Sequence, residues 1–514
     1  MVIRTLILII FKSLKQAIQV NFVYLIKHLK PMYMNLKAFI LLVILTSFFQ
    51  LNAQEKTSIT IKLKTNIANS HCLLANHFGS QKYKVDSIPL DGKGAGIFKD
   101  KKGTIKGGIY MFVFPTFGNQ YVEIILSGKE KNIELTIDSA DFSKVTFKNS
   151  EENDLFYSDV RYLGPYQREV TTLSEEYKTT KDSIRKKGLE TKLIAKEKEL
   201  LDRRLQVINT KGHTFYSKIL NLMRDIDVPE APKKADGSSD PDFKYYYFKN
   251  HYWDYTDFND DRLLYTPIFE NKFKYYFDKL VIKHPDTLKK EVNYVISKIK
   301  DNNSDMMRFC LPTLLNDYAN SKIMGQDALY VHIVKSFYAT GKAPWTDSAT
   351  IQKMINDADD LDPVLIGKTA PNFGVFDTTW VNYARLYDQT KKKYKLLAFW
   401  SADCGHCKKE IPLLDSIYPS LLKNDCDVFS VSTVSEDGKG ENKAQLLNFL
   451  RDKKFKFKTY GDPDYKMNPL FKVLYKIKGT PEYFLLDEKN VIIAKKLGPE
   501  QVLDFLINYR KNNK

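Results

Sequence analysis

The chain has 514 residues, which is enough for about three domains of ordinary size. It is 43% hydrophobic and 27% charged, a composition that is ordinary for a globular protein. The formal net charge is +17, but the lysines are scattered among aspartates and glutamates without a basic block, which argues against a nucleic-acid-binding face.

The first 53 residues have the features of an export signal. Lys37 precedes a short apolar run, residues 38–49, and Ala53 follows that run closely. A charged start, a short apolar core and a small residue before the cut are typical of a secretory signal peptide, and the run is short for a membrane span. We therefore expect residues 1–53 to be a signal region, with Met34 as an alternative start. A signal anchor that stays in place is the other interpretation.

Residues 54–150 are predicted to form a small antiparallel β domain, either a sandwich or a barrel. Residues 59–64 alternate between apolar and polar side chains, and residues 121–126 and 133–137 are also strand-like. Several glycines separate these runs. The segment contains no catalytic constellation, and Cys72 is expected to pack as a small hydrophobic residue.

Residues 151–360 are predicted to form a mostly α-helical domain. Residues 171–211 are long and charged, which indicates either a solvated helix or an exposed helical hairpin. An aromatic block follows at residues 245–255. Aromatic side chains beside basic ones can stack on nucleic-acid bases, but the core and rim of a helical domain is the favoured interpretation. A groove that binds a peptide or another envelope protein is an intermediate interpretation of the aromatic block.

Residues 361–514 contain the motif that carries chemistry, Cys404-Gly405-His406-Cys407. Residues 394–400 before it are apolar enough for a buried strand, and apolar residues recur at helical spacing after it, at Ile411, Leu414, Ile417, Tyr418 and Leu421. A thiol at a helix N-terminus is favoured as thiolate. We therefore expect Cys404 to attack a disulfide and Cys407, one turn later, to resolve the mixed disulfide.

The cysteine pair has three other interpretations. A structural zinc site needs four ligands, and Cys72, Cys310 and Cys426 form no second Cys-x-x-Cys. No metal is therefore expected, and no cofactor beyond a redox-active Cys404–Cys407 disulfide. An inert structural disulfide is the second alternative. A peroxiredoxin-like antioxidant would need Pro-x-x-x-Thr-x-x-Cys, whereas Leu397 and Ser401 stand at the proline and threonine positions.

A second signal stands downstream, where Gly479-Thr480-Pro481 opens an apolar run. Proline suits the first residue of a strand because it has no N–H to donate. The order of strand, Cys-x-x-Cys helix, strand, helix, Gly-Thr-Pro, two strands and helix resembles the thioredoxin-like envelope thiol-disulfide proteins of the TlpA/ResA kind, over roughly residues 361–514. The resemblance implies an α/β thioredoxin fold and a cis peptide bond at Pro481, which would face the cysteine pair beside Thr480.

The same resemblance implies roles for further residues. TlpA/ResA-like proteins carry a Glu in Cys-x-x-Cys-Lys-Lys-Glu, so Glu410 is expected to take the proton of the resolving thiol, or only to complement the helix dipole. Trp400 fills the earlier tryptophan position of thioredoxins, whereas Asp403 replaces the later one and Ala398 the buried acid. Gly405 and His406 form the dipeptide of protein disulfide isomerases, and that histidine can stabilise the thiolate. The redox direction therefore stays open.

Export would place the protein in the periplasm or cell envelope, where disulfides form and must be proofread or reduced. The expected partners are the thiols and disulfides of exported proteins and an envelope electron donor or acceptor, with no nucleic acid and with membrane contact only through an uncleaved signal. The two upstream domains resemble domains of unknown function that precede such thioredoxin-like ends. A non-catalytic envelope binding protein that uses the thioredoxin-like domain as a scaffold is the alternative function.

Overall fold

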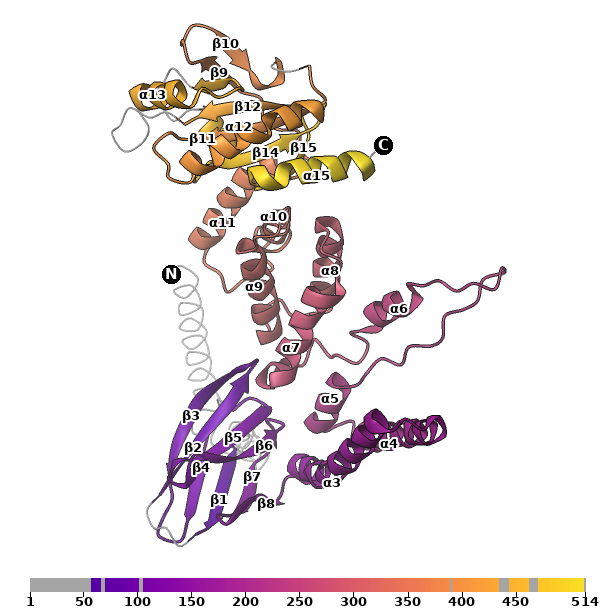
Figure 1. Cartoon of the computed structure of the whole chain (residues 1–514). Helices are drawn as coiled ribbons and strands as arrows, with labels where there is room; N and C mark the ends of the chain where they lie inside the picture. Colours follow the sequence, from indigo (N-terminus) through magenta and orange to yellow (C-terminus); the bar gives the residue numbers. More distant parts are fainter. Residues whose placement is uncertain are drawn as a thin grey trace, which may run out of the picture.

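The computed structural model describes residues 57–65, 70–100, 105–388, 391–433, 443–461 and 470–512. The signal region expected at residues 1–53 lies outside these ranges. None of the helices in the described ranges is both long enough and apolar enough to cross a membrane. Figure 1 shows β-sheets at one end of the molecule, helices in the middle and an α/β domain at the other end.

Two four-stranded sheets form the N-terminal domain. The first has the order β4 (Ala95–Lys99), β1 (Ser58–Lys64), β7 (Asn132–Asp138) and β8 (Asp141–Lys148). The second has the order β3 (Gln81–Pro89), β2 (His71–Phe78), β5 (Gly108–Phe114) and β6 (Gln120–Leu126), with the 3₁₀-helix η1 (Pro115–Phe117) between β5 and β6. Alternate residues of both sheets, among them Ile61, Cys72 and Phe112, are fully buried in one shared core. The predicted β domain is therefore a sandwich.

One strand pair of this domain differs from the antiparallel arrangement that the sequence predicts. β1 and β7 run parallel, with Ser58 opposite Asn132 and Ile61 opposite Leu135. Hairpin turns force neighbouring strands to be antiparallel, but β1 and β7 are not joined by a hairpin, so nothing local sets their direction.

A long helical hairpin follows the β domain, made of α3 (Glu151–Thr179) and α4 (Ser183–Thr210). The side chain of Asp182 caps α4 by accepting from the N–H groups of Ile184 and Arg185. The hairpin is mostly exposed and projects from the molecule (Figure 1). Its base is anchored by Asn153, which exchanges two hydrogen bonds of 2.8 Å with the backbone of Ile125 in β6.

The helices that follow, apart from η5 at the start of the C-terminal domain, pack around one core. They are α5 (Phe215–Leu222), α6 (Phe243–His251), η2 (Asp261–Tyr265), α7 (Pro267–Tyr275), η3 (Tyr276–Leu280), α8 (Pro285–Ser297), α9 (Asp305–Ala319), α10 (Asp327–Ile333), η4 (Val334–Tyr338), α11 (Ser348–Leu361) and η5 (Asp362–Val364). The aromatic block forms both the core and the rim of this domain, because Trp253 is 1% exposed and Tyr246 is 46% exposed. This is the arrangement that the sequence favoured over a nucleic-acid face.

The C-terminal domain is built on a seven-stranded sheet with the order β10-β9-β13-β12-β11-β14-β15. The elements are β9 (Gly374–Asp377), β10 (Tyr383–Arg385), η6 (Leu386–Asp388), β11 (Tyr394–Trp400), α12 (Cys407–Lys423), β12 (Cys426–Ser432), α13 (Lys443–Lys453), β13 (Thr459–Gly461), α14 (Leu470–Tyr475), β14 (Glu482–Leu486), β15 (Ile492–Lys495) and α15 (Pro499–Asn512). β11 is buried along its whole length and lies between parallel β12 and antiparallel β14. This arrangement confirms the predicted α/β thioredoxin fold.

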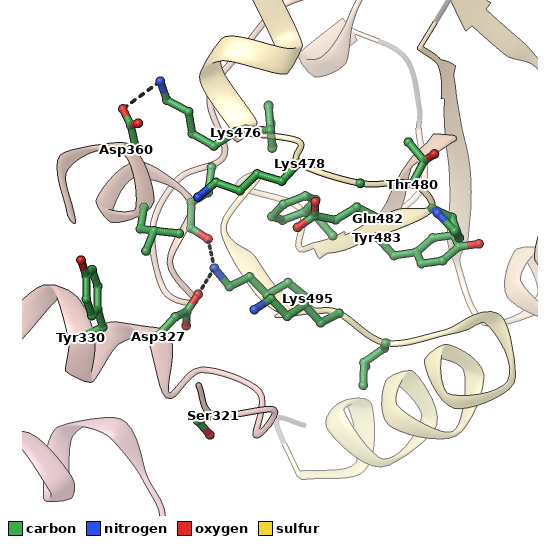
Figure 2. A pocket seen from close by; sticks show the side chains of 18 of the residues that line it. Ser321, Asp327, Tyr330, Asp360, Lys476, Lys478, Thr480, Glu482, Tyr483 and Lys495 are labelled. Atoms are coloured by element: carbon green, nitrogen blue, oxygen red, sulfur yellow. Dashed lines mark hydrogen bonds and ion pairs between the residues drawn. The ribbon is translucent and has the colours of Figure 1, made fainter. Parts of the chain in front are cut away.

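Charged contacts fasten the helical domain to the sheet edge at β15. Lys495, whose side chain is 3% exposed, forms an ion pair with Asp327 of α10 and donates to the carbonyl of Val364 at 2.8 Å (Figure 2). Lys476 Nζ lies 2.8 Å from Asp360 of α11. Met324, from the loop before α10, packs against the core of the C-terminal domain. The helical domain is thereby held beside β14 and the segment that precedes it.

Candidate active site

The cysteine pair lies where β11 gives way to α12. β11 ends at Trp400, whose side chain is fully buried and whose Nε1 donates to Ser430 Oγ at 2.7 Å. The sequence predicts a helix that begins at Cys404, but its first residue is Cys407 and Cys404 lies in the preceding turn. The Cys404 carbonyl accepts from the N–H of Lys408 at 3.0 Å, so this turn leads directly into the helix.

The two thiols have different environments. Cys404 is partly exposed, and its Sγ donates to the carbonyl of Thr480 at 3.1 Å. Cys407 is completely buried, and its Sγ accepts from the N–H of Ser401 at 3.5 Å. Both thiols are free in this structure. A partner can therefore reach Cys404 but not Cys407.

The electrostatics separate the two thiols further. Partial burial acts to raise the pKa of Cys404, but hydrogen bonding from the N–H and thiol of Cys407 outweighs it, and the pKa lies below its ordinary value. Burial raises the pKa of the Cys407 thiol to about 12. Because the thiolate is the nucleophile in disulfide exchange, Cys404 is the more reactive of the pair.

The Thr480–Pro481 peptide bond is cis, as predicted. The loop before β14 brings the Thr480 carbonyl against the Cys404 thiol, so the two motifs that the sequence singled out meet in space.

The residues between and directly before the cysteines are exposed. The imidazole of His406 is exposed, and this residue lowers the pKa of Cys404 through its peptide N–H. Gly405 is also exposed, and a Cβ added there would contact nothing within 4 Å. Asp403 is exposed and its carboxylate accepts from the Ser401 hydroxyl, so it faces solvent.

Two further residues, Glu410 and Tyr483, lie near the cysteine pair. Only Glu410 of these two was predicted from the sequence. Tyr483 is 3% exposed and belongs to the same buried cluster as Cys407. Burial raises the pKa of Tyr483, and the negative charge of Glu410 raises it further. Its hydroxyl is buried, and the half-buried Glu410 carboxylate lies beside it. The signal in the sequence was its place two residues after Pro481.

The other cysteines are distant from this chemistry. Cys72, Cys310 and Cys426 are buried in the cores of the β, helical and α/β domains. In the part of the chain that the structure describes, no group of three or more His, Cys, Asp or Glu residues could hold a metal ion.

Comparisons with known proteins agree with this geometry. The AhpC/TSA family matches residues 366–495, and a domain of unknown function (DUF5106) matches residues 192–360. A thiol-disulfide oxidoreductase ResA from Bacillus thuringiensis subsp. konkukian is 30% identical over 146 residues, which cover 28% of this chain and 77% of the relative. A ResA from Bacillus cereus is 28% identical over 150 residues, covering 29% of this chain and 79% of that relative.

Solved structures with similarity include a domain of a possible thiol-disulfide isomerase from Cytophaga hutchinsonii. It is 36% identical, with a TM-score of 0.25, over 29% of this chain and 95% of that one. A thioredoxin-like protein from Bacteroides caccae is 20% identical, with a TM-score of 0.40, over 55% of this chain and 99% of that one. Through its C-terminal domain, the chain belongs to the thioredoxin-like thiol-disulfide oxidoreductases of the ResA type.

Proposed function

We propose that this oxidoreductase exchanges dithiol for disulfide with exported proteins through Cys404 and Cys407. The observation that carries the proposal is the asymmetry of the pair. Cys404 is accessible and has a lowered pKa, whereas Cys407 is buried and has a pKa raised to about 12. This asymmetry suits one thiol to attack an external disulfide and the other to act only once a mixed disulfide has formed.

In the reducing direction, the Cys404 thiolate attacks one sulfur of a substrate disulfide. A bond forms between Cys404 Sγ and that sulfur, the substrate S–S bond breaks, and the second substrate sulfur leaves as a thiolate that takes up a proton. Cys407 then loses its proton and attacks Cys404 Sγ, which releases the first substrate sulfur. Two electrons pass to the substrate, and the Cys404–Cys407 disulfide remains. The reverse sequence oxidises a substrate dithiol.

Glu410 is proposed to accept the proton of Cys407, with Tyr483 assisting the transfer. The Tyr483 hydroxyl is buried in the Cys407 cluster and next to the Glu410 carboxylate. A thiol whose pKa is about 12 needs an acceptor for its proton before it becomes a nucleophile. No other cofactor is proposed, and the compartment proposed is the periplasm or cell envelope, with an envelope protein as electron donor or acceptor.

Peroxidase activity is the second function that the family match raises. Ser401 stands at the position of the peroxiredoxin threonine. It is 6% exposed and its hydroxyl donates a hydrogen bond to Asp403. The position of the proline is held by Leu397, a fully buried residue inside β11. Thiol-disulfide exchange is therefore the function that we propose.

Trapping with matched variants tests the proposal. Reduced Cys407→Ser protein mixed with insulin should accumulate a mixed disulfide through Cys404, whereas Cys404→Ser protein should accumulate none. Cys426→Ser is the control, since it removes a buried cysteine of the same domain outside the pair and should still reduce insulin. Equal trapping by the two pair variants would refute the assignment of roles.

A further inference from the structure

A cleft with a volume of about 820 Å³ lies between the helical domain and the C-terminal domain. The cleft starts at the active site, because Thr480, Pro481 and Glu410 are part of its lining. The Thr480 carbonyl also accepts a hydrogen bond from the Cys404 thiol. Figure 2 shows the segment from Lys476 to Tyr483 on one side and Asp327 and Tyr330 of α10 on the other.

The helical domain supplies the far wall of this cleft through α9, α10 and α11. Residues of this wall include Tyr318, Ala319, Tyr330 and Leu361. The wall is fixed, because Asp327 pairs with the buried Lys495 and Asp360 pairs with Lys476 across the domain boundary. A substrate that approaches Cys404 from this side therefore meets both domains at once.

The lining combines apolar side chains with charges of both signs. Nine charged side chains line the cleft; four of them form two ion pairs, Asp327 with Lys495 and Asp360 with Lys476, and the other five are three acids and two lysines. Aromatic and aliphatic side chains face the space from both domains, with Tyr318, Tyr330 and Leu361 on one side and Leu497 on the other. Clefts in which apolar side chains predominate beside a few polar groups are typical of binding sites.

Because the Cys404 thiol lies against the Thr480 carbonyl, a substrate cysteine joined to Cys404 would lie at the start of the cleft. We propose that the cleft binds the substrate segment next to that cysteine, and that the helical domain selects segments with an aromatic or aliphatic side chain there. This inference rests on the proposed thiol-disulfide exchange and assigns the helical domain a role as the substrate-selecting wall.

Two exposed alanines of the helical domain provide a matched test. Ala319, the last residue of α9, lines the cleft, whereas Ala339, which follows η4, does not. A tryptophan at position 319 should obstruct the cleft, and one at position 339 should not. Both sites are exposed, so neither substitution disturbs a packed core.

The full chain, reduced and freed of reductant, is mixed with three disulfide probes. One is the dimer of a cysteine peptide with phenylalanine on both sides, one is the dimer of the same peptide with glycines, and one is hydroxyethyl disulfide. The readout is the ratio of each peptide rate to the hydroxyethyl disulfide rate, so a general loss of active protein cancels.

For the unchanged chain and for Ala339→Trp, the phenylalanine peptide should react about tenfold faster than the glycine peptide, which corresponds to about 1.4 kcal/mol. For Ala319→Trp, the preference should fall to about twofold or less, since the apolar contact is blocked.

The possible outcomes distinguish a failure of the selecting wall from a failure of the proposed thiol-disulfide exchange. Equal rates for the two peptides with the unchanged chain, or the same preference in Ala319→Trp as in Ala339→Trp, would overturn the selecting wall while leaving thiol-disulfide exchange in place. If the reduced chain reduces none of the probes, the proposed function itself fails.

Discussion

Ala398 in β11 lies directly opposite Tyr483 in β14, and both side chains belong to the buried cluster that contains Cys407. Ala398 stands where thioredoxins carry a buried acid. The small side chain on β11 faces the large one on β14, and the tyrosine hydroxyl lies beside Glu410. Glu410, the proposed proton acceptor, lies on α12, and Tyr483 lies on β14.

Tyr483→Phe should slow the resolving step and leave stability unchanged. The phenyl ring keeps the packing, while the variant loses the hydroxyl that lies beside the Glu410 carboxylate. We expect a slowing of roughly tenfold, less than the hundredfold or more that removal of the proton acceptor itself can cause. Rapid-quench analysis of mixed-disulfide decay across a pH series provides the measurement. A lowered melting temperature with an unchanged pH profile would show a purely structural role.

Glu410→Gln should slow the same step more strongly and shift the pH profile of mixed-disulfide decay, with the fold intact. Glu500→Gln is the matched control, because Glu500 also lies in the first turn of a helix of this domain but outside the site. Loss of the helix-dipole interaction alone costs about 0.3–1 kcal/mol, and that is the change expected for Glu500→Gln. If the two variants behave alike, Glu410 only complements the dipole.

Alkylation of the reduced protein should separate the two active-site thiols by pH. The rate at Cys404 should rise with pH and reach half of its maximum below about 8.5, the ordinary thiol pKa, because its own pKa is lowered and the thiolate is the reacting form. Cys407, with a pKa of about 12 and no exposed surface, should stay unmodified at neutral pH. Mass spectrometry of peptides after iodoacetamide treatment measures both, with the buried Cys310 as internal reference. Faster labelling of Cys407 would reverse the assigned roles.

Asp327→Asn should weaken the attachment of the helical domain to the C-terminal domain. It leaves Lys495 buried without its carboxylate, and removing one partner of a buried ion pair costs about 3 kcal/mol. Lys476→Met breaks the more exposed pair with Asp360 and should cost less than about 1 kcal/mol. Calorimetry should show a larger loss for Asp327→Asn, and equal losses would contradict the structural ranking of the two contacts.

Local patterns were enough to predict the elements of the active site that are close in sequence. The apolar run of β11, the helical spacing after Cys407 and the proline at the start of β14 each signal their own structure. The role of Tyr483 was not predictable in this way, because it depends on the register between β11 and β14. The contact of Asp327 with Lys495 likewise joins distant segments whose sequences carry no mark of each other.

Because β1 pairs with β7, the first sheet cannot be completed until nearly the whole β domain has been synthesised. A chain that emerges from its N-terminus presents β1 long before Asp138, the last residue of β7, is available. Until then β1 can pair with β4 on one side only, and its other edge is open to strands of other molecules. Pairing between segments so far apart in sequence also forms slowly. β1 is therefore exposed to pairing with other molecules until β7 has been synthesised.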